Sequence, residues 1–181
     1  MGQFRDNMAA HYEQQRERER YDEAKRAEFA AYLGDLVSVL MEREIEPLPV
    51  YLLDGIRDVQ TPTRGGIFRQ RTVTTREHDY RFRHNGWLVL PSHSNYDNDY
   101  DGIIVTEDID AYTMKSARLV TEDLNENWGY QYKGIHGFPA ILTGGDTSKG
   151  SSYMMHDLDT QARRLAESGD HVKHALDLQS R

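Results

Sequence analysis

Residues 29–53 read FAAYLGDLVSVLMEREIEPLPVYLL, and the change of pattern inside this stretch decides the fold. Before the prolines, apolar side chains recur at spacings of three and four, which is typical of one face of an α-helix. Pro47 and Pro49 end the helical pattern, because proline lacks a backbone N–H and restricts the residue before it. The apolar stripe consists of Phe29, Leu33, Leu36, Val37 and Leu40.

The helical pattern extends toward the amino terminus, so we predict one long helix over residues 5–44. Its early segment, RERERYDEAKR at 16–26, is charged nearly all round. Such a segment suits a helix that lies in water or against a partner rather than on its own core. We therefore expect the second half to pack and the first half to project. The candidate partner-binding residues are Arg16, Arg18, Arg20 and Tyr21.

Beyond the prolines, the pattern is typical of β-strands: short β-branched or aromatic segments bounded by Gly, Pro, Asn or Asp. We predict an α+β fold with an antiparallel β-sheet of about five strands or more, near the usual sheet size. The segment 111–120 fits either a strand or a helix. The five strand segments are 50–53, 67–73, 79–83, 87–90 and 103–106, and later strands or extended core segments are expected at 128–132 and 140–143.

The carboxyl-terminal part predicts a short helix that Ser151 or Ser152 can cap, with Gly169 interrupting it. Residues 170–179 fit a short final helix or a fraying tail. The apolar residues of the first of these helices are Met155, Leu158, Ala162 and Leu165. The expected organisation is a helical segment at 1–46 with an exposed first half, a β-rich core at 47–150 and a helical segment at 151–181.

Composition limits the classes of function. A chain of 181 residues fits a single domain. The net charge of −8 argues against nucleic acid wrapping the whole surface, because phosphates select clustered positive charge. The chain has no cysteine, which excludes disulfides, thiolate zinc sites and thiol catalysis. No stretch approaches the ~20 apolar residues of a membrane span, so we expect a soluble, cytoplasmic protein without a membrane partner.

The segment DNDYDGIIVTED at 97–108 resembles the calcium loop of an EF-hand. Its acidic residues fall at the first, third, fifth and last ligand positions, with Gly102 at the turning position. The last position holds Asp rather than the usual Glu, as in dockerin-like loops. The resemblance implies a calcium or magnesium site formed by Asp97, Asp99, Asp101 and Asp108. Because the preceding segment predicts a strand, we also interpret 97–108 as an acidic hairpin connection.

Basic residues are concentrated in the predicted strands between Arg57 and Arg83, where seven basic and three acidic residues occur. A period of two places Tyr80 and Phe82 on one face of a strand, and Arg81 and Arg83 on the other. Aromatic side chains beside arginines can bind single-stranded nucleic acid. An ordinary half-buried strand with solvated arginines explains the same pattern.

Two further features fit structural roles better than catalytic ones. His171 and His174 would share one helix face and could ligate a metal, but HExxH is absent and no third ligand is indicated. We predict that both are surface residues. The segment GGDTSKG at 144–150 could cradle a phosphate, but it does not match the P-loop pattern. We predict a flexible connection there.

The leading hypothesis is a non-enzymatic binding or assembly protein whose charged amino-terminal helix engages a protein partner or another copy of the chain. A small accessory protein of a bacterium or phage would fit this description. The competing hypothesis is a calcium- or magnesium-binding domain, or a metal-dependent enzyme, that uses the 97–108 loop. The third is nucleic-acid binding through the basic strands at 57–83.

Overall fold

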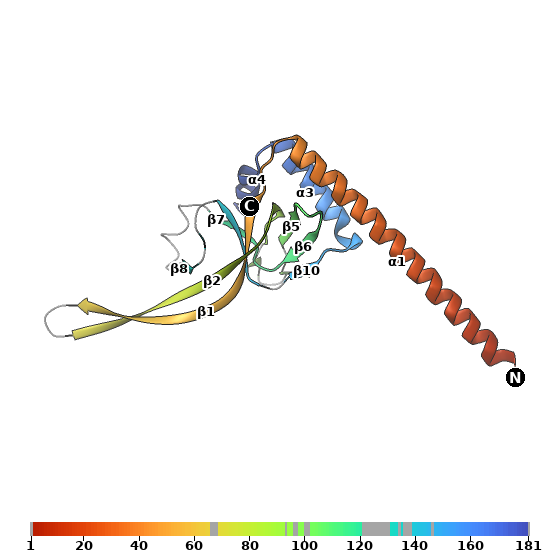
Figure 1. Cartoon of the computed structure of the whole chain (residues 1–181), viewed down its shortest axis with the longest axis horizontal. Coiled ribbons are helices and arrows are strands. Elements are labelled where there is room, and N and C mark those ends of the chain that lie inside the picture. The colour runs from red at the N-terminus through yellow and green to blue at the C-terminus, as the bar shows by residue number, and fades with distance from the viewer. Residues whose placement is uncertain are drawn as a thin grey trace.

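The computed structural model describes residues 2–65, 69–92, 94–95, 98–99, 102–120, 131–133, 135, 139–145 and 147–180. The chain begins with α1 (Gly2–Glu42), followed by β1 (Leu48–Gly65) and β2 (Arg69–Leu90) (Figure 1). The later strands are β3 (Ser94–Asn95), β4 (Asn98–Asp99), β5 (Gly102–Thr106), β6 (Ala111–Met114), β7 (Arg118–Val120), β8 (Gln131–Lys133), β9 (Ala140–Thr143) and β10 (Thr147–Lys149). The chain ends with the 3₁₀-helix η1 (Ser152–Met154), α3 (Met155–Ser168) and α4 (His171–Gln179).

The main sheet confirms the α+β class. Its strand order is β10-β6-β5-β2-β1-β9-β7, and β8 pairs with the outer part of β2. The sheet is mixed rather than wholly antiparallel, because β9 runs parallel to β1 and β8 parallel to β2. Both parallel strands come late in the chain and reach partners far away in sequence, so no tight hairpin turn fixes their direction. The segment 111–120, ambiguous in sequence, contains the strands β6 and β7.

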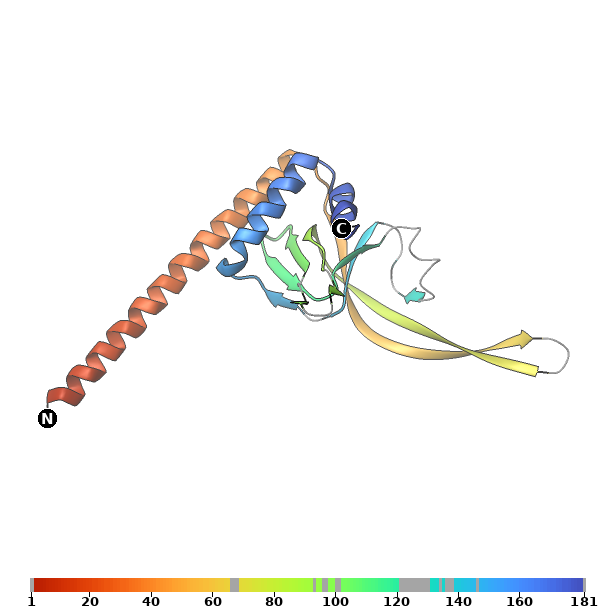
Figure 2. The same cartoon turned by 180° about the vertical axis from the view of Figure 1, so that it is seen from behind.

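Helices cover both faces of the central strands. Trp87 and Val89 of β2 belong to the core cluster that also contains side chains of α1 and α3, which lie side by side in Figure 2. Leu88 and Ile104 belong to a second cluster with Ala175 of α4. Alternate residues of a strand point to opposite faces, so all five residues of β5 are buried.

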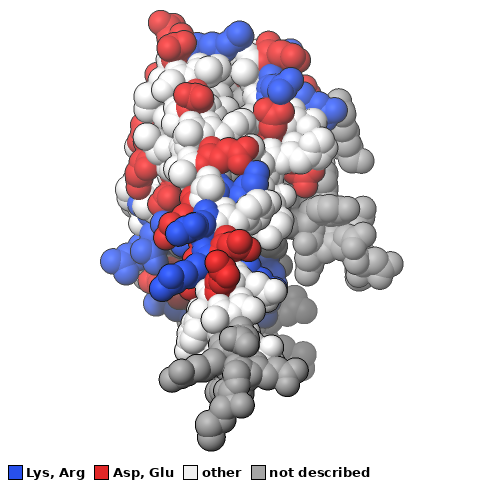
Figure 3. All heavy atoms as spheres, turned by 90° about the vertical axis from the view of Figure 1, so that its right-hand side faces the viewer, with Lys and Arg blue, Asp and Glu red and all other residues white. Residues whose placement is uncertain are grey.

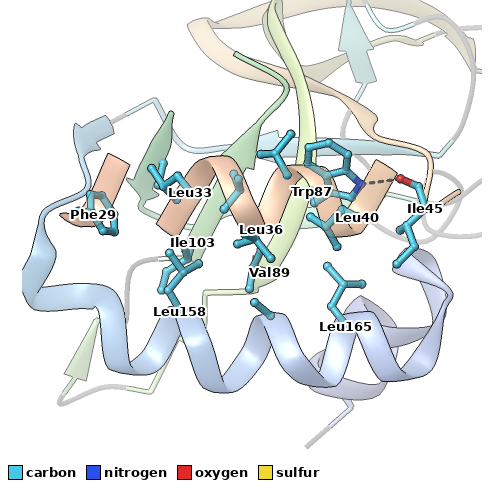
Figure 4. Close-up of a cluster of buried hydrophobic side chains, with 14 residues drawn as sticks. Phe29, Leu33, Leu36, Leu40, Ile45, Trp87, Val89, Ile103, Leu158 and Leu165 are labelled. Atoms are coloured by element: carbon cyan, nitrogen blue, oxygen red, sulfur yellow. Dashed lines mark hydrogen bonds between the residues drawn. The ribbon is translucent and has the colours of Figure 1, made fainter. Parts of the chain in front are cut away.

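The apolar stripe of α1 packs on the sheet as its spacing predicts. Its five members are buried with Trp87, and the Trp87 indole Nε1 donates a hydrogen bond of 2.7 Å to the carbonyl oxygen of Ile45 (Figure 4). Tyr32 Oη donates to Asp159 Oδ1 of α3 at 3.3 Å, and Arg43 Nη1 donates to the carbonyl of Ala166 at 2.8 Å. These contacts fix the second half of α1 to both the sheet and α3.

Two elements extend beyond this core in different directions (Figure 1). No residue of α1 between Asn7 and Glu28 is buried. On the other side, β1 and β2 pair antiparallel from Leu48 opposite Gly86 to Gly65 opposite Arg69. The part of this ribbon from Gly55 to Asp79, excluding residues 66–68, is called the arm below. The sequence predicted several short strands here, whereas continuous pairing makes β1 and β2 two long strands with bulges near Tyr51 and Gly55.

The first prediction compares two glycines. A Cβ atom on Gly86 would lie 2.5 Å from the backbone oxygen of Val105, whereas one on Gly34 of α1 would meet nothing within 4 Å. We expect Gly86→Ala to lower the free energy of unfolding by about 1–3 kcal/mol, because rigid backbone must shift. We expect Gly34→Ala to raise it by about 0.5–1 kcal/mol through helix propensity. Urea unfolding followed by circular dichroism measures both, and equal effects would contradict the packing described here.

Candidate functional site

A groove lies between the middle of α1 and the turn that joins β10 to α3. Its volume is about 630 Å³, which is in the range of ligand or peptide pockets. Phe29, Leu33 and Ala111 give it an apolar lining. Its surroundings include the exposed side chains of Tyr21, Ile109 and Tyr153, and Tyr153 is 92% exposed. Large exposed apolar and aromatic groups around a hollow are typical of a recognition surface.

Charged side chains around the groove are paired with one another. Lys149 Nζ lies 3.2 Å from Asp110 Oδ2, which also accepts a hydrogen bond of 3.2 Å from Tyr112 Oη. Lys25 Nζ lies 2.7 Å from Glu28 Oε2. The hydrogen bond to Asp110 raises the pKa of Lys149, and the hydrogen bond to Glu28 raises the pKa of Lys25. The charges largely neutralise each other, which favours recognition of shape and apolar contact over recognition of one sign of charge.

The four predicted partner-binding residues lie on the exposed half of α1, and all four are exposed. Tyr21 lines the groove. Arg16 and Arg20 are one turn apart on the same side of the helix, whereas Arg18 points to nearly the opposite side. The arginines therefore do not form one basic face. Acidic and basic side chains lie intermingled on the side toward which α1 projects (Figure 3).

The structure describes only the second half of the EF-hand-like segment with its side chains, from Gly102 to Asp108. Gly102 begins the straight strand β5 instead of making a turn, and a Cβ there would lie 2.6 Å from the Cβ of Ala117. Asp108 follows the opposite end of β5, about 13 Å or more away at the usual rise per residue. Its Oδ2 lies 3.2 Å from His84 Nδ1. Antiparallel pairing of β2 with β5 agrees with the hairpin interpretation.

The remaining part of the metal prediction is untested. Asp97 and Asp101 lie outside the described residues, and only the backbone of Asp99 is described, in β4. Among the described side chains, no group of three or more His, Asp or Glu residues is placed to hold a metal ion. A calcium or magnesium site at these three aspartates stays a prediction.

The basic strands contain arginines in two different environments. In the arm, Arg57 lies 2.9 Å from Glu77 and Arg76 lies 3.3 Å from Asp58, so both are paired across the ribbon. Arg81 and Arg83 are exposed near the base of the arm. Between them, Phe82 is exposed and its ring contacts the ring of Tyr51 at a centroid distance of 5.9 Å.

The prediction that His171 and His174 lie at the surface is wrong, because they are only 4% and 5% exposed. His171 Nε2 accepts a hydrogen bond of 2.7 Å from the Leu88 amide, and His174 Nε2 lies 3.2 Å from the Val89 carbonyl oxygen. The pairing of β1 with β2 stops at Gly86, so the histidines of α4 supply partners for β2 beyond that point. The sequence around the two histidines does not indicate this role, because the groups that they bind belong to the backbone of β2, which is distant in the chain.

The second prediction concerns pH. Burial chiefly, and His174 in addition, lowers the pKa of His171 from 6.5 to about 4, while contacts with Glu46, Asp170 and Leu88 oppose the shift. The fold therefore favours the neutral ring. The contribution of the neutral His171 ring to the free energy of unfolding is fully present above pH 6.5 and is lost as the pH falls toward 4. Between pH 7 and pH 5, we expect the free energy of unfolding to fall by about 2 kcal/mol. Urea unfolding at both pH values measures this loss.

The control for this prediction uses two histidine variants. His171→Gln should make the stability less dependent on pH, because it removes the buried titrating ring. His156→Gln, at an exposed position of α3, should retain the pH dependence of the parent protein. If His171→Gln retained the full pH dependence, another group would be responsible.

The groove residues contributed by β6, β10 and η1 were missed by sequence reasoning. Lys149 lies in the segment predicted to be a flexible connection, which contains the edge strand β10. No family model matches the chain, and neither the curated proteins nor the solved structures include a significant match. Among the described helices, none is long and apolar enough to cross a membrane.

Proposed function

We propose that the protein is a non-enzymatic binding or assembly protein, which engages a macromolecular partner through the exposed half of α1. The observation that carries this proposal is the absence of any buried side chain between Asn7 and Glu28, on a helix that is anchored to the core from Phe29 onward. A helix with polar residues all round gains little from its own core. A binding partner accounts for such a segment, and the groove at its base extends the available surface.

The anchored half of α1 also explains why the projecting half suits recognition. A helix of 41 residues is about 60 Å long, and fixing one end orients the other. The intrahelical contacts Gln15–Glu19 and Lys25–Glu28 support the helical state. A surface that is already ordered loses less conformational entropy on binding. We place this function in the cytoplasm, in a small accessory protein of a bacterium or phage.

The third prediction tests the proposed function directly. Deleting residues 1–22 should leave cooperative unfolding intact, because the apolar stripe begins at Phe29. The truncated protein should lose partner capture in a pull-down from the native host. Reversing Arg16, Arg18 and Arg20 to Glu in the full chain should also reduce capture, since like charges at an interface are unfavourable.

The matched control reverses exposed cations outside α1. Lys115→Glu combined with Lys173→Glu should leave capture unchanged, because both residues are exposed and lie on other elements. Binding through α1 would be contradicted if the protein lacking residues 1–22 still captured the partner. It would also be contradicted if the lysine control lost as much partner capture as the arginine variant. Loss of cooperative unfolding on truncation would instead assign residues 1–22 a structural role.

A second candidate function is nucleic-acid binding at the base of the arm. It is favoured by the exposed Phe82 on one face of β2 and by the exposed Arg81 and Arg83 on the other, since aromatic rings stack on bases and arginines pair with phosphates. The net charge of −8 and the pairing of Arg57 and Arg76 with acids make this the weaker proposal.

The fourth prediction follows from this second function. Single-stranded oligonucleotides should bind with an affinity that falls as salt rises, and Arg81→Ala with Arg83→Ala should reduce both the affinity and the salt dependence. Fluorescence anisotropy at several salt concentrations measures this. Arg57→Ala is the control, because that arginine already pairs with Glu77. Binding that is absent at low salt would eliminate the nucleic-acid proposal.

A further inference from the structure

Two separate surfaces carry exposed apolar groups, one on α1 and one in the groove between α1 and the turn that joins β10 to α3. The first is near the amino terminus, where Met8 and Tyr12 are exposed one turn apart. The ring of His11 packs against that of Tyr12, with the two ring centroids 6.4 Å apart. The second is the groove, with the exposed Tyr153 and Ile109 beside its apolar lining. Residues one turn apart on a helix are the usual anchors by which a helix enters a groove.

We propose that α1 pairs antiparallel with α1 of a second copy of the chain, so that Met8 and Tyr12 of each copy enter the groove of the other. This inference rests on the proposed function, and it names the partner. A two-fold axis near the middle of the projecting helix would make both contacts equivalent, which is the usual arrangement in a closed dimer.

The helix geometry matches this arrangement. Met8 and Lys25 are seventeen residues apart, about 26 Å along the helix, so the amino-terminal patch cannot reach the groove of its own chain. In an antiparallel pair that places Met8 level with Lys25 of the partner, Tyr12 is level with the partner's Tyr21. Both Lys25 and Tyr21 line the groove. One register therefore brings each patch to a groove.

Charge also favours a second copy over a strongly charged partner. Between Glu13 and Arg20 there are three glutamates and three arginines, so this central segment has no net charge although the chain carries −8. Two such segments can lie side by side without net repulsion. The ion pairs around the groove likewise leave it without a dominant sign of charge.

The absence of native cysteine permits a sharp test by disulfide trapping. In Met8→Cys combined with Tyr153→Cys, an intrachain disulfide is excluded, because even Tyr21 of the groove lies about 20 Å from residue 8 along the helix and a disulfide requires Cα atoms within about 7 Å. Mild oxidation should give covalent dimers. Ala10→Cys with Tyr153→Cys is the matched control, since position 10 is exposed on the opposite side of α1, and it should give far fewer.

Light scattering gives a second, independent readout on the unmodified chain. At high concentration, the parent protein should have a molecular mass twice the 21.0 kDa of one chain, and it should dissociate on dilution. Met8→Glu should weaken dimerisation at least tenfold, whereas Ala10→Glu should not. Met8 is exposed, so circular dichroism should show an intact fold in both variants.

The outcomes separate this inference from the proposed function. A monomeric parent protein, or equal trapping in the two cysteine pairs, would overturn the antiparallel dimer. If such a monomer still captured a host protein only when residues 1–22 were present, the proposed function would stand with a different partner. A dimer that survives deletion of residues 1–22 would also overturn the inference, because its interface would lie elsewhere.

Discussion

The arrangement of the whole molecule depends on the contact between Trp87 and the end of α1. Trp87 is fully buried, and its indole N–H binds the carbonyl of Ile45, just beyond the last turn of the helix. A buried indole without this acceptor would lose a hydrogen bond that costs about 1–3 kcal/mol to leave unmade. The bond therefore fixes the point at which the helix ends and β1 begins. Because Arg43 binds α3 at the same corner, the direction of α1 relative to the sheet is set there.

Burial on both faces of the sheet explains why its central strands tolerate unusual features. Close packing requires Gly86, where a side chain would collide with the backbone of the neighbouring strand. Where β1 no longer accompanies β2, two imidazoles bind the backbone of β2: His171 Nε2 accepts from the Leu88 amide, which requires a neutral ring, and His174 Nε2 lies beside the Val89 carbonyl oxygen. Away from this core, the arm has no covering helix among the described residues, and cross-strand ion pairs replace apolar contacts. The same two strands thus change from apolar to polar as they leave the core.

The sequence predicted the elements whose signals are local. The spacing of apolar residues from Phe29 to Leu40 correctly predicted which half of α1 packs on the core. In the same way, the apolar residues Leu158, Ala162 and Leu165 of the predicted α3 are buried. It could not predict the continuity of β2, because pairing with β1 carries the strand through segments that lack strand-forming residues. The groove was equally inaccessible, since Lys149 and Tyr153 approach α1 only after folding. Short acidic spacing resembles an EF-hand loop, whereas the apolar residues that follow Gly102 form the strand β5, which places Asp108 beyond the opposite end of that strand.

These features together restrict the kind of partner that suits α1. A helix that presented one sign of charge would attract any oppositely charged polymer, whereas this one alternates arginine and glutamate through its central turns. Its selectivity must therefore come from geometry: the few exposed apolar side chains, their spacing along the axis, and the position of the groove. A helical protein surface of matching length supplies such a pattern more readily than a uniformly charged polymer.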